Sequence, residues 1–298
     1  MAESSQPWTE QPPRLNVGVV GTGRAGSVLG AALIRAGHHV RACTAVSDIS
    51  RLRAESLLPG VPIMSVEQTV AQRDLVLLTV PDDVLPELVA GLAATNSISA
   101  GTFVMHASGR FGVEVLSALA AKGCLPLALH PVMTLTGTSL DLTRISGCPF
   151  GVTAAEELRP VAEALVVEMG GEPIWVLEEN RALYHAALAF GSNHLMTLVN
   201  QTNDLLAAAG IENPAELSLP LLSASLDNAI RQGDLAVTGP VVRGDSQTVS
   251  AHVQELSKQG NAVLQTYLAL ARLTAERALE SGQLRADDAA RLMEVLGQ

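Results

Sequence analysis

The sequence predicts a doubly wound parallel α/β sheet followed by an all-α region, and three observations lead to this fold class. An apolar run of strand character at 15–20 leads through a glycine-rich turn into a helix at 27–36 and a second strand at 39–44. Segments of strand and helix character then alternate as far as Leu177, which is typical of parallel sheets. From Glu178 onward the strand patterns stop, and the remaining chain has helical periodicity.

The turn after the first predicted strand is Gly21-Thr22-Gly23-Arg24-Ala25-Gly26, which has the spacing G-x-G-x-x-G. In this motif the first glycine permits a tight turn, the second lets the backbone approach a pyrophosphate, and the third lets helix and strand pack closely. The N–H groups at the start of the following helix add partial positive charge. Strand, motif, helix and second strand occur in the required order, so we expect this turn to bind a dinucleotide in the manner of a Rossmann domain.

The tip of the second predicted strand indicates which dinucleotide binds. An NAD site usually places Asp or Glu there, on the ribose 2′-OH. This chain instead offers Ser47, Ser50 and Arg51, with Arg53 two residues further, as hydroxyl and bidentate guanidinium ligands for a 2′-phosphate. These residues predict NADP(H). Asp48 leaves a ribose contact open, although its place at the start of a helix also suits a helix cap.

The alternation continues through the rest of the α/β region. We predict strands at 61–64, 75–80, 101–106, 124–130, 150–152 and 173–177, and helices at 49–58, 83–94, 111–122 and 156–169. Ligands in such sheets bind beyond the carboxyl ends of the strands. We therefore expect Val80, Pro81 and Ser108 to lie against the nicotinamide, and Ser108 and His130 to contact the substrate. A structural role at a strand tip remains the alternative for His106 and His130.

The second part of the chain is helical throughout. We predict helices at 180–209, 215–232, 248–257, 262–281 and 286–296, with a loop at 233–245. The polar, proline-rich segment 1–14 has no apolar core of the signal-peptide kind and predicts a disordered tail. The sequence thus predicts a nucleotide-binding domain at 15–178 and a helical domain at 179–298.

Composition excludes several classes of function. The chain of 298 residues has 30 acidic and 19 basic residues, a net charge of −11, which disfavours nucleic acid and anionic membranes as partners. Apolar stretches are too short for a transmembrane helix. Cys43, Cys124 and Cys148 are widely spaced, which fits a reducing cytoplasm and predicts neither a disulfide framework nor a zinc site. We expect no bound metal.

The predicted helix at 180–209 has one polar face that is almost free of charge. This face carries His185, Ser192, Asn193, Thr197, Asn200 and Asn203. A solvated helix face normally carries charged side chains, so the pattern favours either a substrate-binding wall or a buried interface of paired amides. On the first interpretation His185 is the general acid, because the reference pKa of histidine lies near neutral pH, and Ser192 and Asn193 bind the substrate.

The loop TGPVVRGD at 238–245 holds further candidates. Arg243 is a bidentate ligand for a substrate carboxylate, with Thr238 and Asp245 beside it. Two other interpretations remain open: an ion pair between Arg243 and Asp245, or a helix cap by Asp245.

The chain resembles a family of actinobacterial Rossmann-like oxidoreductases with a C-terminal helical domain of formerly unknown function, over about 15–281. The resemblance rests on GTGRAG, VPDD (80–83), HASG (106–109), LHP (129–131), YHAA (184–187), SNH (192–194) and TGPVVRGD. In layout that family is similar to ketopantoate reductase, pyrroline-carboxylate reductase and the 6-phosphogluconate dehydrogenase-like β-hydroxyacid dehydrogenases.

What the resemblance implies is a cytoplasmic, homodimeric, NADPH-dependent reductase of a small 2-keto acid, ketopantoate being the substrate most suggested. An imine reductase of the pyrroline-carboxylate kind and a non-catalytic NADP(H) sensor are the alternatives. Ketopantoate reductase and the hydroxyacid dehydrogenases use a lysine on the first long helix of the second domain, whereas this chain has only Lys122 and Lys258. His185 stands near the expected lysine position, and Asn193 follows about two helical turns later.

Overall fold

The computed structural model of the chain describes residues 13–297. They form two compact units, which divide between Ala189 and Phe190, inside the long helix α8 (Arg181–Ala208). Each unit has a hydrophobic core of its own. The predicted disordered tail falls on residues outside the described range, apart from its last two. Of these, Arg14 donates from Nη1 to the carboxylate of Glu168 at 2.8 Å.

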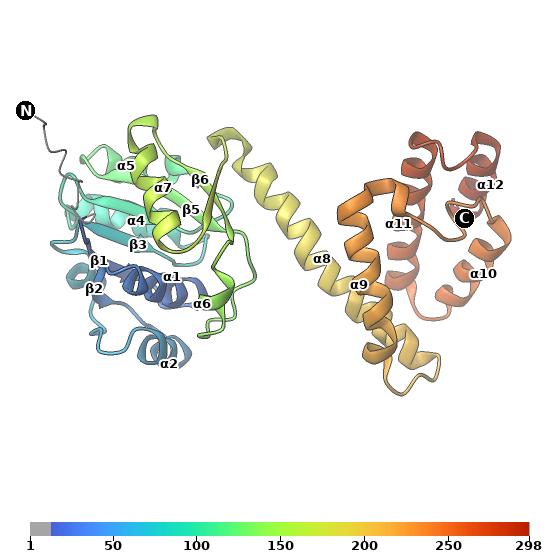
Figure 1. Ribbon diagram of the computed structural model, residues 1–298, viewed down its shortest axis with the longest axis horizontal. Coiled ribbons are helices and arrows are strands. Elements are labelled where there is room, and N and C mark those ends of the chain that lie inside the picture. Colours follow the sequence, from blue (N-terminus) through green and yellow to red (C-terminus); the bar gives the residue numbers. More distant parts are fainter. Residues whose placement is uncertain (1–12, 298) are drawn as a thin grey trace, which may run out of the picture. The chain divides into compact units, whose positions relative to one another are not determined.

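A seven-stranded sheet forms the centre of the first unit, in the order β2-β1-β3-β4-β5-β6-β7 (Figure 1). Its strands are β1 (Asn16–Val20), β2 (His39–Cys43), β3 (Leu75–Leu78), β4 (Phe103–His106), β5 (Leu125–Pro131), β6 (Pro149–Thr153) and β7 (Glu172–Trp175). All neighbouring strands run parallel except β5 and β6, which are antiparallel. The Val132 N–H donates to the Pro149 carbonyl at 2.8 Å, so β6 starts at the edge of the sheet where β5 ends. The predicted fold class is confirmed, with this antiparallel pair as a correction.

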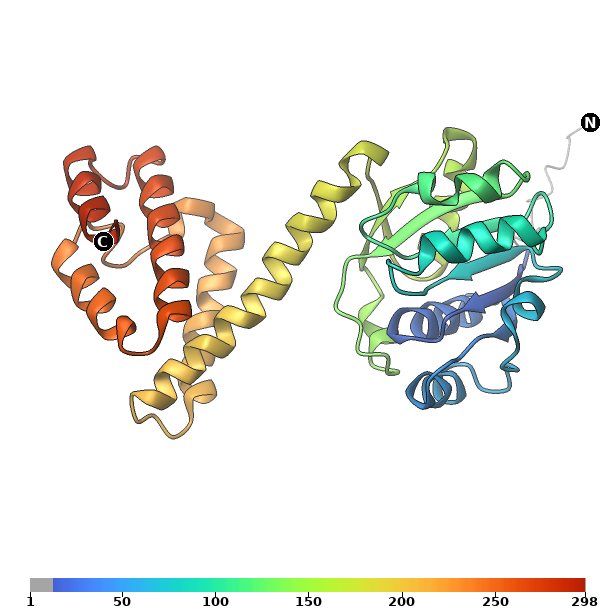
Figure 2. The ribbon, with the colours of Figure 1, turned by 180° about the vertical axis from the view of Figure 1, so that it is seen from behind.

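Helices cover both faces of the sheet. They are α1 (Arg24–Arg35), α2 (Asp48–Leu57), α3 (Val66–Val70), α4 (Leu85–Thr95), α5 (Ser117–Ala120), α6 (Asp141–Arg144) and α7 (Arg159–Glu168), with 3-10 turns η1 (Val113–Leu116), η2 (Glu156–Leu158) and η3 (Glu178–Asn180). Helices α1 and α7 lie on one face, and α4 and α5 on the other (Figures 1 and 2). Alternate residues of β3 serve the two faces: Leu75 and Leu77 join the core under α1, while Val76 and Leu78 join the core under α4.

Two predicted elements of the first unit are wrong. The segment 61–64 is not a strand, since only Ile63 forms a bridge, to Cys43. The predicted helix 111–122 is reduced to η1 and α5. The chain at its start is held as a loop, because the Gly112 carbonyl accepts from His106 and the Val113 N–H donates to Glu178.

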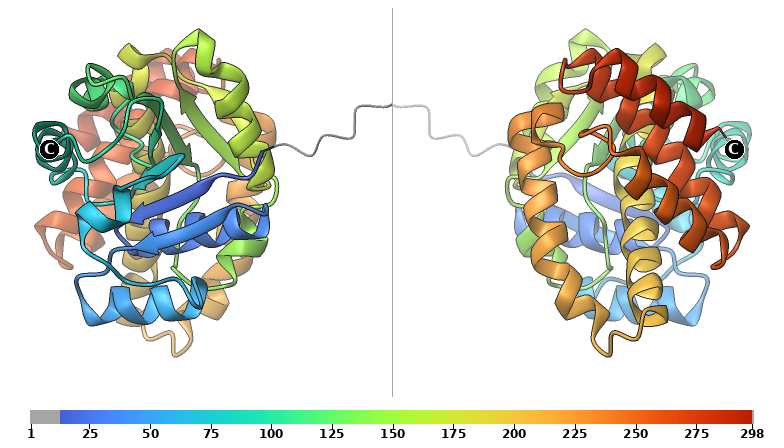
Figure 3. Two further views of the ribbon diagram at one scale, coloured as in Figure 1. Left: turned by 90° about the vertical axis from the view of Figure 1, so that its left-hand side faces the viewer. Right: turned by 90° about the vertical axis from the view of Figure 1, so that its right-hand side faces the viewer.

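The second unit consists of helices. After α8 come α9 (Pro214–Gln232), η4 (Gly233–Ala236), α10 (Ser246–Ser257), α11 (Asn261–Glu280) and α12 (Ala286–Leu296). The last three pack around a core that includes Val249, Leu268 and Leu292 (Figure 3). Helix α9 is tied to α8 by a hydrogen bond from Ser218 Oγ to Asn203 Oδ1 at 2.8 Å. Within residues 13–297, no helix has both the length and the apolar character to cross a bilayer.

Candidate functional site

The glycine-rich turn joins β1 to α1, as the sequence predicts. Gly21 has a φ of +98°, a left-handed conformation that glycine adopts without strain. A Cβ on Gly26 would collide with the carbonyl oxygen of Gly21 and the hydroxyl of Thr79. That hydroxyl donates to the Gly21 carbonyl at 2.6 Å. The packing of α1 on the sheet therefore requires glycine at both positions.

Gly23 and its neighbours form the open side of the turn. Apart from its own chain neighbours, no described atom lies within 4 Å of the place that a Cβ on Gly23 would take. Gly23 is the N-cap of α1 and receives no side-chain cap, so N–H groups of the first turn remain available to an anion. Arg24 is exposed and Ala25 is half-buried, whereas Thr22 is buried and donates to the Ser50 carbonyl at 3.1 Å. Thr22 supports the loop from within, and the open side fits a pyrophosphate.

Ser47 and Ser50 form the cap of α2. The Ser50 N–H donates to Ser47 Oγ at 3.2 Å, and the Ser50 hydroxyl donates to the Ser47 carbonyl at 2.7 Å. Ser50 is buried, while Ser47 and Arg51 are exposed. Asp48 is the first residue inside α2, not its cap. Of the predicted ligands for a 2′-phosphate, Ser47 and Arg51 are thus exposed, while Arg53 is half-buried beside Gly137.

The tips of β3 and β4 lie at the same edge of the sheet as the glycine-rich turn. Val80 is half-buried and Pro81 is exposed. His106 is buried and donates from Nε2 to the Gly112 carbonyl at 2.8 Å, while its Nδ1 accepts from the Ser108 N–H at 3.2 Å. Burial lowers the pKa of His106 to about 4, so this imidazole stays neutral. His106 is a structural residue that shapes the loop carrying Ser108.

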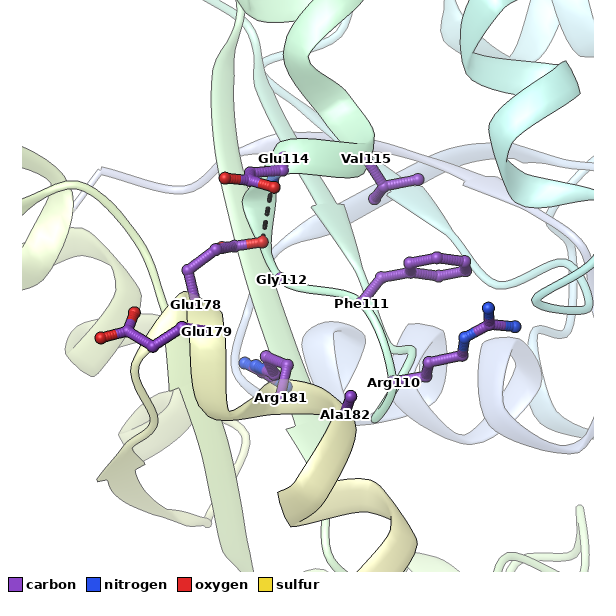
Figure 4. A pocket seen from close by; sticks show the side chains of 9 residues that line it. All are labelled: Arg110, Phe111, Gly112, Glu114, Val115, Glu178, Glu179, Arg181 and Ala182. Carbon is purple, nitrogen blue, oxygen red and sulfur yellow. Dashed lines mark hydrogen bonds between the residues drawn. The ribbon is translucent and has the colours of Figure 1, made fainter.

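A pocket of about 440 Å³ lies where this loop meets η3 (Figure 4). It is lined by Arg110, Phe111, Gly112, Glu114, Val115, Glu178, Glu179, Arg181 and Ala182. The Glu178 carboxylate accepts from the N–H groups of Val113 at 2.7 Å and Glu114 at 3.2 Å. A Cβ on Gly112 would collide with that carboxylate. None of the predicted site residues lines this pocket, and its Glu178 is used to hold the loop.

Two histidines and a tyrosine gather at the carboxyl ends of β4 and β5. His130 Nδ1 lies 2.9 Å from the hydroxyl of Tyr184. The rings of His130 and His185 are 6.0 Å apart and nearly perpendicular. A Cβ on Gly109 would lie 2.6 Å from His185 Cδ2 and 2.9 Å from His130 Nε2, so glycine lets both rings approach the backbone after β4. The structure thus brings together His130 and His185, two of the predicted site residues.

Arg181 anchors the start of α8 in the sheet. Its side chain is 1% exposed. The guanidinium donates to the hydroxyl of Thr153 at 2.8 Å and to the carbonyls of Ala128 and Gly151 at 2.9 Å each. Its Nη1 has no hydrogen-bond partner among the described residues. The Arg181 guanidinium carbon lies 5.6 Å from the centre of the Tyr184 ring, so a buried positive charge contacts the face of this ring.

The other predicted site residues belong to the second unit. Ser192 and Asn193 are exposed on α8, two turns beyond His185 on that helix. Thr238 and Arg243 are exposed on the loop before α10. Asp245 caps α10, accepting from the N–H of Thr248 at 3.0 Å and from its hydroxyl at 2.7 Å, which lowers the pKa of Asp245. The helix-cap interpretation of Asp245 is the one that the structure displays.

Sequence reasoning missed Tyr184 and Arg181. Both lie in the first turn of α8, next to His185, which was singled out. The sequence offered two signals: a single arginine at the end of the α/β region, and a tyrosine hydroxyl directly before His185. Residues 13–297 contain no cluster of three or more His, Cys, Asp or Glu suited to a metal ion.

Two family models match the chain. Residues 1–131 match the Rossmann-like domain, and residues 148–274 match a domain of unknown function, DUF2520. A curated glycerol-3-phosphate dehydrogenase [NAD(P)+] of Rhodopseudomonas palustris is 29% identical over 169 residues. That match covers 52% of this chain and 49% of the dehydrogenase, so the chain spans about half the length of this curated relative.

Solved structures share the fold over most of the chain. A Bacteroides fragilis protein, provisionally described as an NADP oxidoreductase, has a TM-score of 0.76 at 18% identity, covering 88% of this chain and 98% of its own. The pyrroline carboxylate reductase of Plasmodium falciparum, with NADP bound, has a TM-score of 0.55 at 13% identity, covering 93% and 98%. At these identities the likeness shows the fold alone.

Proposed function

We propose that this chain, which matches the Rossmann-like and DUF2520 family models over 1–131 and 148–274, is an NADPH-dependent reductase of a small 2-keto acid. The observation that carries the proposal is the position of two features at one edge of one sheet. The turn that fits a pyrophosphate follows β1, and the cluster of His130, Tyr184 and His185 lies at the carboxyl ends of β4 and β5. Parallel strands bring their carboxyl ends to the same edge, where such sheets bind ligands.

For the cofactor, we propose that residues 15–178 form the binding domain. The N–H groups of the glycine-rich turn would hold the pyrophosphate, and Ser47 and Arg51 the 2′-phosphate. Val80, Pro81 and Ser108 would lie against the nicotinamide. Bound NADPH would supply the hydride.

For the substrate, we propose that 179–298 is the helical substrate and dimerisation domain. His185 would protonate the developing alkoxide. Ser192 and Asn193 would hydrogen-bond the substrate, and Arg243, on a loop with Thr238, would bind its carboxylate. The three buried free cysteines suit a reducing cytoplasm as the working compartment.

Ketopantoate is the substrate that we propose first, and a pyrroline-carboxylate imine is the alternative. The alternative is favoured by one observation: the chain has no lysine between Lys122 and Lys258, so no lysine stands on α8. The test is the loss of NADPH absorbance on addition of ketopantoate, other 2-keto acids or pyrroline-carboxylate to the purified protein. Turnover of a keto acid is expected. Tight NADPH binding without turnover of any of these compounds would replace the reductase by a cofactor sensor.

We expect NADPH to bind at least tenfold more tightly than NADH, about 1.4 kcal/mol, because the exposed Arg51 guanidinium can pair with a 2′-phosphate. Arg51→Ala should erase most of that preference by weakening NADPH binding alone. Isothermal titration of both cofactors measures the two affinities. Arg159→Ala, which removes a guanidinium from the far helix α7, is the matched control and should leave them unchanged. Equal affinities in the unmodified protein would contradict the assignment.

We also expect a homodimer formed through the helical domain. Large apolar side chains of α9 are exposed, among them Leu221 at 68% and Ile230 at 76%, and such a surface usually marks an interface. Light scattering should give twice the chain mass at micromolar concentration. Ile230→Glu should yield monomers, whereas Val167→Glu, at a 59% exposed site on α7, should remain dimeric. A monomeric unmodified protein would argue against the interface.

A further inference from the structure

Tyr184 and His130 form a pair that the sheet is built to accommodate. The two rings are 5.7 Å apart and perpendicular, with the hydroxyl 2.9 Å from His130 Nδ1. A Cβ on Gly151, in β6, would collide with the hydroxyl of Tyr184. The absence of a side chain at Gly151 therefore leaves the space in which the phenol reaches the histidine.

The protonation of the Tyr184 hydroxyl decides which group donates in this hydrogen bond. Burial raises the pKa of Tyr184, so its hydroxyl keeps the proton at neutral pH. Among the described residues, His130 Nδ1 is the acceptor within hydrogen-bond distance of that hydroxyl. If Nδ1 carried a proton, the phenol proton of the half-buried Tyr184 would have no acceptor among the described residues. Tyr184 therefore donates to Nδ1, and the proton of the neutral imidazole lies on Nε2.

The surroundings of His130 keep its ring uncharged. Burial, together with the positive charge of Arg181, lowers the pKa of His130 to about 4, and His185 and His106 act in the same direction. The Arg181 guanidinium is fixed by hydrogen bonds to Thr153 and to two sheet carbonyls, so this charge does not move away. At neutral pH His130 is thus a hydrogen-bond donor and not an acid.

We propose that Tyr184 is a positioning residue that holds His130 in its Nε2–H tautomer, so that His130 donates a hydrogen bond to the substrate oxygen during reduction. The Nε2 edge of His130 lies 2.9 Å from the Cβ position of Gly109, beside His185 Cδ2. The donor thus faces the segment after β4, at the edge where such sheets bind ligands. The inference rests on the proposed reductase function and divides the chemistry between the two histidines.

Protons and electrons balance when His130 stabilises the oxygen and His185 supplies the proton. The substrate carbonyl carbon receives a hydride and is reduced, the nicotinamide is oxidised, and the C=O π bond becomes an alkoxide lone pair. The neutral Nε2–H of His130 stabilises this oxygen as the charge develops but keeps its own proton. The proton that completes the alcohol comes from His185, which takes it back from solvent.

Two measurements test the proposal: NMR spectra report the tautomer of His130, and steady-state kinetics report the rate. Long-range ¹H–¹⁵N spectra of histidine-labelled protein should show His130 with its proton on Nε2 and no titration between about pH 8 and pH 5.5, given its lowered pKa. Tyr184→Phe keeps the ring and removes the hydroxyl, so His130 should lose this single tautomer. In that variant kcat should fall by about tenfold or more, with KM and NADPH affinity within about twofold, as orienting groups behind working histidines typically behave.

The chain offers a matched control in its second unit. His252 and Tyr267 form a similar pair, with Nδ1 and hydroxyl 3.0 Å apart and rings at 80°. Tyr267→Phe should leave kcat and the His130 spectrum unchanged. A proton on Nδ1 of His130, or an unaltered kcat in Tyr184→Phe after the tautomer is lost, would overturn the proposal. The spectra need no turnover, so failure of the proposed reaction would leave the tautomer result standing.

Discussion

Replacement of His185 by alanine is expected to lower kcat by about 10²–10⁴-fold, the usual contribution of a general acid. The ring lies against Gly109 and His130 at the carboxyl edge of the sheet, where the proposed substrate would sit. NADPH affinity should stay nearly constant, because the residues proposed to hold the phosphates belong to β1, α1 and α2. Single-turnover and steady-state rates, together with NADPH titration, measure the effect.

Thermal unfolding of the same preparation separates catalysis from packing. If His185 contributes only to packing, the alanine variant should lose stability and keep its kcat per folded molecule. His194→Ala is the control on the same helix, since His194 is exposed and contacts Phe190 edge-on. It should keep its rate. Unchanged turnover in His185→Ala would direct attention to Ser108 and Thr238 instead.

Gly26→Ala is expected to cost about 3 kcal/mol or more in unfolding free energy, the upper range for overpacking a close contact. The new Cβ would collide with the Gly21 carbonyl and the Thr79 hydroxyl, and neither can move without disturbing β1 or β3. Chemical denaturation of the purified variant measures the loss. A variant with unchanged stability would mean that α1 does not pack on the turn as described.

Gly23→Ala is the matched partner of that experiment. Its Cβ would meet no described atom outside the chain neighbours, and the φ of Gly23 is −67°, which alanine adopts readily. Unfolding free energy should fall by less than about 1 kcal/mol, while NADPH affinity should drop at least about tenfold because the methyl group occupies the pyrophosphate site. Normal NADPH binding by this variant would argue against the turn as the cofactor site.

The fold could be predicted because its signals are local. A mostly apolar run, a glycine pattern and a helical period each report on neighbours in the chain. They located β1 and β2 to within one residue at each end and the start of α1 to within three. The segment 61–64 has the same apolar character but only Ile63 pairs with Cys43. Whether an apolar run becomes a strand depends on the partner that the rest of the fold supplies.

The candidate site could be predicted only in part, because its contacts are distant in sequence. His185 stands out in the sequence by its place on an uncharged helix face, whereas nothing local to Tyr184 marks its hydroxyl as part of the site. Its hydroxyl bonds to His130, which lies 54 residues earlier. Ser50 is a candidate that the sequence suggests and the structure does not favour. Its hydroxyl donates to the Ser47 carbonyl in the cap of α2 and is not left for a phosphate.

The anchoring of Arg181 has a consequence for biosynthesis. Strands β5 and β6 leave the ribosome before Arg181 does, and until it emerges the Ala128 and Gly151 carbonyls lack the guanidinium donor that they have in the finished protein. A nascent chain that stops after β7 therefore has all seven strands but leaves these two carbonyls without their side-chain donor. The nucleotide-binding unit therefore completes its hydrogen bonds only after the first turn of α8, which carries Arg181, has been synthesised.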